Sequence, residues 1–295
     1  MTWLGTTVLM LKVCVGLGVL SIPSAFDTLG MIPGVICLLA IGGIVTWSSY
    51  MVGVFKIKHP EIYGIDDTGA LLFGPVGRYI FGGAFCLTYI FVAGSGMLSI
   101  SIGLNAVSGH GTCTAVFVAV AAIASVGLGS IRTLGKLQWL AWIGVVSIIV
   151  AVFILTVAVG VQDRPADAPT SSEWKSDWKL FGAPTFLEAA TALTTFVFAY
   201  AGTPTFFGVV AEMRNPREYP KALILCQSVM TTMYLVIGIV VYYYCGTFVA
   251  SPALGSAGTL FKKVCYGIAL PGLLVTTTLA IHVRSLFPVP LDGDC

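Results

Sequence analysis

An apolar run long enough to cross a bilayer contains residues 12–23, which read Lys12-Val13-Cys14-Val15-Gly16-Leu17-Gly18-Val19-Leu20-Ser21-Ile22-Pro23. The stretch holds a lysine, two closely spaced glycines and a proline. Glycine frees the backbone, and proline removes an N–H and clashes with the preceding turn, so both weaken a helix. A broken membrane helix is tolerated where the freed backbone groups line a cavity or face other protein. We therefore predict that residues 12–23 form half of a small-molecule binding site.

The composition is typical of a polytopic membrane protein. Of the 295 residues, 57% are hydrophobic and 9% are charged, whereas soluble domains carry about 25% charged residues. The net charge of +2 and the absence of a basic run argue against a nucleic-acid partner. The eight cysteines show no metal-ligand spacing. Since no catalytic motif is present either, we expect no metal, no cofactor and no enzymatic activity.

Eight apolar runs are long enough to span a bilayer as helices, which makes the expected fold all-α. They lie at about 3–26, 31–55, 79–107, 112–131, 138–161, 184–211, 221–248 and 264–283. Lys and Arg in the connecting segments predict the orientation, because cytoplasmic loops carry an excess of them. With a cytoplasmic N-terminus, the inner side holds Lys56, Lys58, Arg78, Arg132, Lys136, Arg214, Arg217, Lys221 and Arg284, and the outer side holds Arg164, Lys175, Lys179, Lys262 and Lys263. We therefore predict that the N-terminus is cytoplasmic.

A second interruption falls five helices after the first, at Phe198-Ala199-Tyr200-Ala201-Gly202-Thr203-Pro204. Folds made of two inverted five-helix repeats place one discontinuous helix at the start of each repeat. The spacing predicts a single transmembrane domain over 1–295. Its first repeat covers about 3–161, an incomplete second repeat covers about 184–283, and a divergent tail covers 284–295.

The two interruptions together predict a site for a zwitterion. Ends of half-helices offer unpaired N–H groups to a carboxylate, and unwound carbonyls accept from an ammonium group. The predicted substrate-binding residues are Val15, Gly16, Leu17, Gly18, Val19, Phe198, Tyr200, Ala201, Gly202 and Thr203. The alternative is that the small residues only allow close helix packing.

Lys12 is the basic residue that lies within a predicted span. An ionisable side chain at this depth costs about 2.5–3.5 kcal/mol on insertion scales, so it needs a partner or a role. The alternative is snorkelling to the cytoplasmic surface over roughly 13 Å, at 1.5 Å per residue.

Two further features leave alternatives open. Glu212 and Arg214 follow the second broken helix and form either a cytoplasmic gate or a solvated helix end. Cys113 and Cys245 both fall near the predicted outer face, and the sequence leaves open whether they form a disulfide.

Several motifs resemble the amino acid/auxin permease family, within the amino acid–polyamine–organocation superfamily. They are Gly16-x-Gly18-Val-Leu-Ser-Ile-Pro23, Phe198-Ala-Tyr-Ala-Gly202 running to Ala211-Glu-Met-Arg-Asn-Pro216, and the polar stretch Tyr63 to Gly77. Leu11-Lys12, Asp163-Arg-Pro-Ala166 and the segment from Cys245-Gly246 to Gly258 are similar to fungal neutral amino-acid permeases of the methyltryptophan-resistance type. The resemblance covers roughly 3–283.

The resemblance implies a LeuT-like inverted-repeat bundle and secondary active transport of neutral, aliphatic or aromatic amino acids, coupled to protons and independent of sodium. In sodium-coupled relatives, the positions similar to Lys12 and the Thr276–Thr278 region form a sodium site. We infer that the Lys12 ammonium stands where sodium would, and that Thr276, Thr277 and Thr278 complete an ion-coupling site. Alternatively, the threonines bond back to their own helix.

The resemblance also sets expectations for completeness and location. Family members have ten or eleven helices, so a chain with eight is expected to be truncated. The alternative function is a truncated, non-transporting membrane protein that binds amino acid or associates with other subunits. The plasma membrane is the favoured location, and the vacuolar membrane is the alternative.

Overall fold

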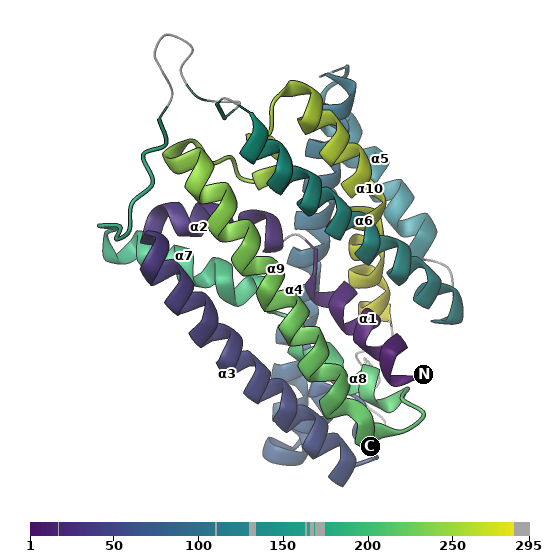
Figure 1. The fold of residues 1–295 in the computed structure, drawn as a ribbon. Coiled ribbons are helices and arrows are strands. Elements are labelled where there is room, and N and C mark those ends of the chain that lie inside the picture. The colour runs from purple at the N-terminus through teal and green to yellow at the C-terminus, as the bar shows by residue number, and fades with distance from the viewer. Residues whose placement is uncertain are drawn as a thin grey trace.

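The computed structural model describes residues 1–16, 18–109, 111–129, 134–162, 164–165, 168 and 175–285, with the backbone alone at 134–139 and 282–285. Every regular element in these ranges is helical, as the composition predicts (Figure 1). The α-helices are α1 (Trp3–Cys14), α2 (Ile22–Leu29), α3 (Met31–Lys58), α4 (Ile65–Ser108), α5 (Thr114–Gly129), α6 (Leu134–Val161), α7 (Phe186–Ala199), α8 (Phe206–Ala211), α9 (Tyr219–Cys245) and α10 (Thr259–Ser285). The short 3-10 helices are η1 (Gly18–Ser21), η2 (Thr203–Thr205), η3 (Pro216–Glu218), η4 (Gly246–Phe248) and η5 (Ala253–Ser256).

Each of the eight predicted runs coincides with a helix or a broken pair of helices. Within the described ranges, six helical segments are long and apolar enough to span a membrane, and a seventh is the pair α1 and η1–α2, bent by 48°. α5 is apolar but has 16 residues, which is short for a span. The chain is therefore a multi-pass membrane protein, and most of the predicted tail lies outside the described residues.

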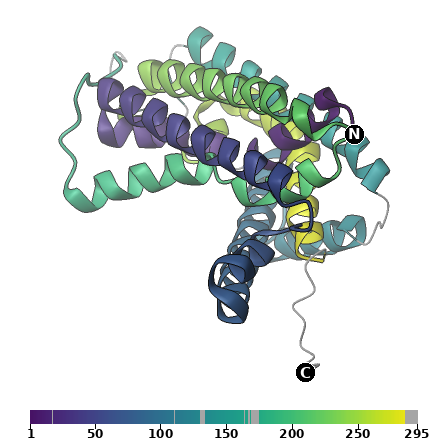
Figure 2. The ribbon, with the colours of Figure 1, turned by 90° about the horizontal axis from the view of Figure 1, so that it is seen from below.

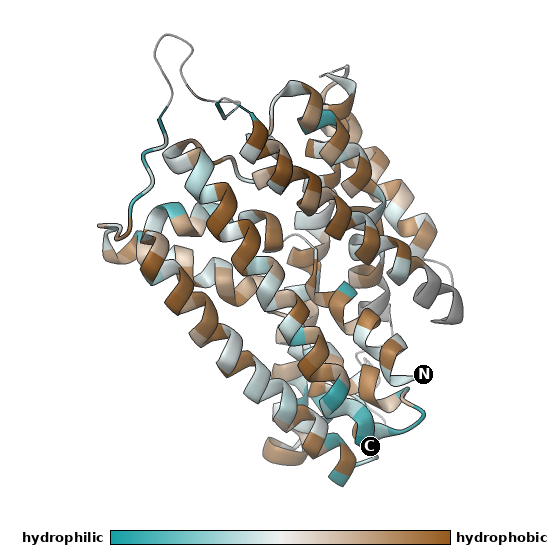
Figure 3. Ribbon diagram, viewed as in Figure 1, coloured by the Kyte–Doolittle hydropathy of each residue, from teal (hydrophilic) through white to brown (hydrophobic). Residues whose placement is uncertain are grey.

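Large apolar side chains cover the outward faces of the helices. Trp47, Phe91 and Phe153 are each exposed by 67–68%, which would be unfavourable in water but suits contact with lipid. Figure 3 shows the hydrophobic residues along the lengths of the helices and the hydrophilic ones mainly in the connecting segments.

The helices pack as two groups (Figures 1 and 2). The first group holds α1, α2, α3, α7, α8 and α9, and the second holds α4, α5, α6 and α10. α1 contacts both α6 and α10, and α6 contacts α9, so the groups meet along α1 and α6. Both broken helices lie in the first group, although the residues at which their first halves end, Cys14 and Ala199, are far apart in the chain.

The start of α4 differs most from the sequence prediction, which treated residues 56–78 as a polar connection. Helix begins at Ile65 and kinks at Gly74, whose φ of 68° is left-handed. Asp66 and Asp67 lie in the first turn, where carboxylates are favoured by the helix dipole. Because these charges lower the local hydropathy, a search for apolar runs does not predict this helical segment.

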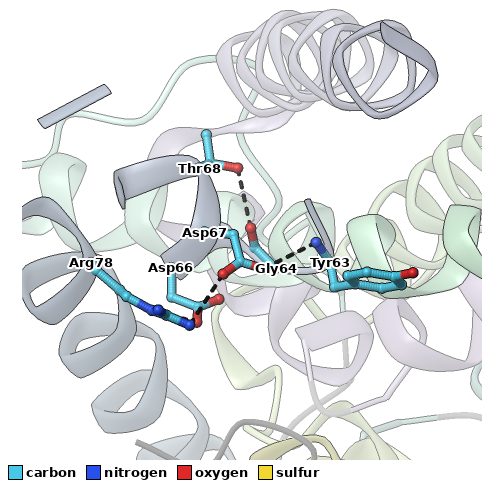
Figure 4. Close-up of polar contacts among 6 residues, drawn as sticks. All are labelled: Tyr63, Gly64, Asp66, Asp67, Thr68 and Arg78. Atoms are coloured by element: carbon cyan, nitrogen blue, oxygen red, sulfur yellow. Dashed lines mark hydrogen bonds and ion pairs between the residues drawn. The ribbon is translucent and has the colours of Figure 1, made fainter. Parts of the chain in front are cut away.

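A cluster of polar side chains joins the two arms of this kink (Figure 4). Arg78 Nη2 lies 3.4 Å from Asp67 Oδ1, and Arg78 Nε lies 3.9 Å from Asp66 Oδ2. The other Asp67 oxygen accepts from the Tyr63 backbone N–H at 3.1 Å. Because these groups are partly exposed, each ion pair stabilises by at most about 1 kcal/mol. The cluster therefore serves to orient the arms.

At the other end of α3, residues 175–182 form an extended segment across its start. The backbone N–H groups of Met31 and Ile32 donate to the carbonyls of Lys179 and Leu180, each at 3.0 Å. The first N–H groups of a helix have no partner within the helix. This segment therefore caps α3.

The Asp177 carboxylate anchors the same segment to the end of α9. Thr247 donates its backbone N–H to Oδ1 at 2.9 Å and its hydroxyl to Oδ2 at 2.7 Å. Burial opposes ionisation of Asp177, but these hydrogen bonds outweigh it and lower the pKa of the carboxyl. A lowered pKa means that the stabilisation is present above the unfolded value of about 3.9 and is lost as the pH falls through the folded value.

We expect Asp177→Asn to lower the unfolding midpoint of the purified chain at neutral pH, by an amount equivalent to about 1 kcal/mol or less. The difference from the parent chain should shrink as the pH falls below about 4. Thermal unfolding in detergent across this pH range measures the difference, with Glu218→Gln as the control for loss of a carboxylate that makes one weak ion pair, 3.9 Å from Lys221 Nζ. A difference that grows on acidification would contradict this interpretation.

Cys113 and Cys245 are both free in the structure, so the disulfide that the sequence left open is not formed. Cys245 is buried at the end of α9, whereas Cys113 is exposed just before α5.

Candidate functional site

Both helices are interrupted where the sequence predicts. α1 ends at Cys14, Val15 is extended with φ −81° and ψ 99°, and helical geometry returns at Gly18. α7 ends at Ala199, and residues 200–202 form turns before η2 and α8 continue the chain. Leu17, one of the predicted substrate residues, lies outside the described residues.

The two interruptions contact each other directly. A Cβ added to Gly18 would lie 2.5 Å from the Ala199 Cα, and a Cβ on Gly202 would lie 2.2 Å from the Cys14 Sγ. No side chain fits at either distance. The two glycines therefore let the broken ends of α1 and α7 meet.

A tyrosine that sequence reasoning missed lies between these ends. The Tyr234 hydroxyl, from α9, donates to the Ala199 carbonyl at 2.8 Å and lies 3.5 Å from the Cys14 carbonyl. Tyr234 is fully buried, and its ring packs edge-on against Tyr200 with centroids 5.1 Å apart. The Tyr200 hydroxyl shares a hydrogen bond of 3.0 Å with Thr231. α9 thus contacts the second break through Tyr234 and Thr231.

The remaining predicted substrate residues divide into buried and exposed positions. Val15 and Val19 are buried beside the first break. The Thr203 hydroxyl lies 2.9 Å from the Ser49 hydroxyl of α3. Phe198, in contrast, is 40% exposed, so its side chain does not join the others. A helix that is apolar on all sides gives no sequence signal for this direction.

Lys12 is fully buried, and its ammonium is bonded inside the protein. Nζ donates to the Gly272 carbonyl at 2.9 Å and to the Thr276 Oγ1 at 2.5 Å, both on α10. On α6, a Cβ added to Gly144 would lie 2.6 Å from the Lys12 Cε. This geometry excludes snorkelling in the described conformation. Lys12 instead joins α1 to α10 and packs against α6.

Of the three threonines, only Thr276 contacts Lys12 in the described part of the chain. The Thr276 hydroxyl itself donates to the Gly272 carbonyl at 2.9 Å, which completes a ring of three polar groups. Thr277 donates to the Leu273 carbonyl of its own helix at 2.9 Å, and the buried Thr278 hydroxyl has no hydrogen-bond partner among the described residues. Gly16 also packs closely against Thr276, since a Cβ added to Gly16 would lie 2.7 Å from the Thr276 Cγ2.

A cavity of about 50 Å³ joins the surroundings of Lys12 to the second break. Its lining consists of Lys12, Val13, Thr88, Tyr89, Val92, Ala201, Thr276, Leu279 and Ala280. Each water needs about 10–15 Å³ of such space, so the cavity has room for a few waters. Binding pockets for small molecules are usually about 300–1,000 Å³. The site is therefore closed in this conformation.

Glu212 and Arg214 are exposed, and among the ion pairs of the described residues none joins their side chains. Their backbone groups instead contact Met1. The Met1 ammonium donates to the Glu212 carbonyl at 2.5 Å, and the Arg214 N–H donates to the Met1 carbonyl at 2.9 Å. A gate formed by these residues stays a prediction. In the described ranges, no group of three His, Cys, Asp or Glu residues is arranged to hold a metal.

Comparison with known proteins identifies the family. The chain is similar to an N amino acid transport system protein of Neurospora crassa, with 36% identity over 292 residues that cover 97% of this chain and 61% of the relative. A transmembrane transporter of Gibberella moniliformis is 35% identical over 286 residues, which cover 97% and 60%. Amino acid transporter AVT1H of Arabidopsis thaliana is 24% identical over 301 residues, which cover 98% and 63%. The chain thus spans about three fifths of the length of these relatives.

The sequence model described as "Transmembrane amino acid transporter protein" matches residues 1–287. That match includes both helix interruptions, Lys12 and the threonines of α10. The chain therefore belongs to the amino acid/auxin permease family of transmembrane amino acid transporters.

Proposed function

We propose that this chain carries the substrate site of a secondary active transporter of neutral amino acids that is coupled to protons and independent of sodium. The observation that carries the proposal is the meeting of two broken helices beside a buried ammonium group. Gly18 and Gly202 bring the ends of α1 and α7 together, and Lys12 lies on the neighbouring face of α1.

The substrate is proposed to bind by its backbone groups. The carbonyls of Cys14 and Ala199 lie at the C-terminal ends of half-helices, where partial negative charge suits an α-ammonium group. The N–H groups at the starts of η1 and η2, which directly follow the breaks, suit the α-carboxylate. Val15, Val19 and Tyr200, beside the breaks, are uncharged. A side chain in this environment gains most if it is neutral.

Lys12 is proposed to replace a coupling sodium ion. Sodium needs oxygen ligands, and the two oxygens that face the Lys12 ammonium, Gly272 O and Thr276 Oγ1, are of that kind. With the ammonium bonded to them, a sodium ion has no place. Reversible protonation of the amine would then couple the site to protons. Thr277 and Thr278 belong to this proposal only as neighbours on α10.

The inverted repeat is also a proposal, and the packing supports it. The opening helices of both predicted repeats lie in the first group, as α1–α3 and α7–α9. The third helices of both, α4 and α10, pack against each other in the second group. A single domain over 1–295, a cytoplasmic N-terminus, a plasma-membrane location and a gate at Glu212 and Arg214 complete the proposal.

Binding and uptake by the purified chain test the function. We expect saturable binding of radiolabelled leucine in detergent, with competition by other neutral amino acids and none by lysine or glutamate. In liposomes, we expect an inward proton gradient to drive uptake and a sodium gradient to leave it unchanged. Binding without uptake would favour the second candidate, a non-transporting protein that binds amino acid. Absence of leucine binding would contradict both.

A further inference from the structure

The Tyr234 hydroxyl occupies the position between the two half-helix ends. Its oxygen is 2.8 Å from the Ala199 carbonyl oxygen and 3.5 Å from the Cys14 carbonyl oxygen. These carbonyls terminate α7 and α1, so the helices themselves give them no regular partner. The proposed function needs the same oxygens for the substrate ammonium.

A tyrosine hydroxyl carries one proton, so it can donate to one of the two carbonyls at a time. The geometry assigns that proton to Ala199, which leaves Cys14 O with a contact at the limit of hydrogen bonding. An ammonium group carries three donors. It can therefore satisfy both carbonyls where Tyr234 satisfies one.

We propose that Tyr234 acts as a latch. Without substrate, its hydroxyl donates to the Ala199 carbonyl between the two breaks, and in the bound state the ammonium group of the amino acid replaces it as the donor to that carbonyl. This inference rests on the proposed function. It makes Tyr234 a residue that sets substrate affinity by competition. A ligand shifts such an equilibrium only through a difference in contacts between the two states, and the exchange of one donor for three supplies that difference.

The surroundings of Tyr234 suit a latch. The chain closes directly around it, because Gly18 packs on Ala199 and Gly202 packs on Cys14. The neighbouring cavity of about 50 Å³ is too small for an amino acid, so binding requires the side chains around the breaks to move. The Tyr234 hydroxyl reaches both half-helix ends from α9, a separate helix, so its release frees the Ala199 carbonyl for another donor.

Replacement of Tyr234 by phenylalanine tests the latch in the full chain. The ring and its packing on Tyr200 remain, but Ala199 O loses its donor in the substrate-free state, and the bound state loses nothing. We expect Tyr234→Phe to bind leucine about tenfold more tightly, which corresponds to about 1.4 kcal/mol. Without leucine, its unfolding midpoint should be lower than that of the parent chain, and saturating leucine should reduce this difference.

Tyr219→Phe is the matched control. Tyr219 also lies on α9, is also buried, and donates to a backbone carbonyl, Ser49 O, at 2.8 Å. Its replacement should lower the unfolding midpoint and leave leucine affinity unchanged. Unchanged or weaker leucine binding by Tyr234→Phe, with the parent chain binding normally, would overturn the latch. No leucine binding by the parent chain would instead overturn the proposed function and the latch with it.

A second measurement compares two ligands. N,N-dimethyl-leucine carries one ammonium proton, so it offers no more donors than Tyr234 does. The parent chain should bind it at least tenfold more weakly than leucine, and Tyr234→Phe should recover part of the loss. If Tyr234→Phe does not fold, equal binding of the two ligands by the parent chain would by itself contradict the exchange of one donor for three.

Discussion

Lys12→Met is expected to abolish the pH dependence of leucine uptake and to lower uptake at acidic pH at least tenfold, a loss of about 1.4 kcal/mol or more. Methionine is of similar length and fills the space against Gly144, but it has no ammonium group. The ring on α10 survives in part, because the Thr276 hydroxyl still donates to the Gly272 carbonyl. The fold should therefore persist, while the charge proposed to take the place of sodium is lost.

Uptake into liposomes at acidic and neutral pH measures this effect, with Lys12→Asn as a second uncharged variant. Lys56→Met is the matched control. Lys56 is also buried and donates to two backbone carbonyls, those of Pro60 and Ile62, but it lies at the end of α3, away from the breaks. The control should keep the pH profile of the parent chain. An unchanged rate and pH profile for both Lys12 variants would remove Lys12 from the coupling mechanism.

Gly18→Ala is expected to have the second large effect, a loss of leucine affinity of about a hundredfold or more, which corresponds to about 2.8 kcal/mol. The new Cβ would lie 2.5 Å from the Ala199 Cα and 3.0 Å from its Cβ. Backbone atoms cannot move aside as a flexible side chain would, so the ends of α1 and α7 must separate. The carbonyls proposed to bind the ammonium would then no longer converge.

Gly208→Ala provides the comparison, because it lies on α8 close to the second break and an added Cβ would meet no atom within 4 Å. The leucine affinities of the parent chain, Gly18→Ala and Gly208→Ala are compared by equilibrium binding. The control should bind like the parent and gain slightly in stability, since alanine favours helix by about 1 kcal/mol over glycine. Equal affinities for Gly18→Ala and Gly208→Ala would mean that contact between the breaks does not form the site.

The breaks could be predicted from the sequence because their causes are local. Gly16, Gly18 and Gly202 weaken helix locally, and Pro23 and Pro204 are favoured in the first turn that follows a break. The spans could be predicted because the bilayer fixes their length. The helical start of α4 could not, since Asp66, Asp67 and Arg78 form a polar cluster at its kink that hydropathy alone interprets as loop.

The sequence does not predict which side chains point toward lipid and which point into the protein. In a membrane, faces toward lipid and faces toward protein are both apolar, so periodicity does not distinguish them. Phe198, which the sequence predicts for the site, is therefore exposed, and Tyr234, which no sequence pattern singles out, contacts both half-helix ends. Lys12 was recognisable because a buried charge is costly wherever it points, but its partner Gly272 is a backbone carbonyl, which no sequence pattern indicates.

Hydrogen exchange with and without leucine tests most directly whether an amino acid binds between the two breaks. We expect leucine to slow amide exchange in residues 18–21 and 200–205 together and to leave exchange in η4 and η5 unchanged. Slowed exchange elsewhere in the chain, with both breaks unaffected while leucine is bound, would contradict binding between the breaks.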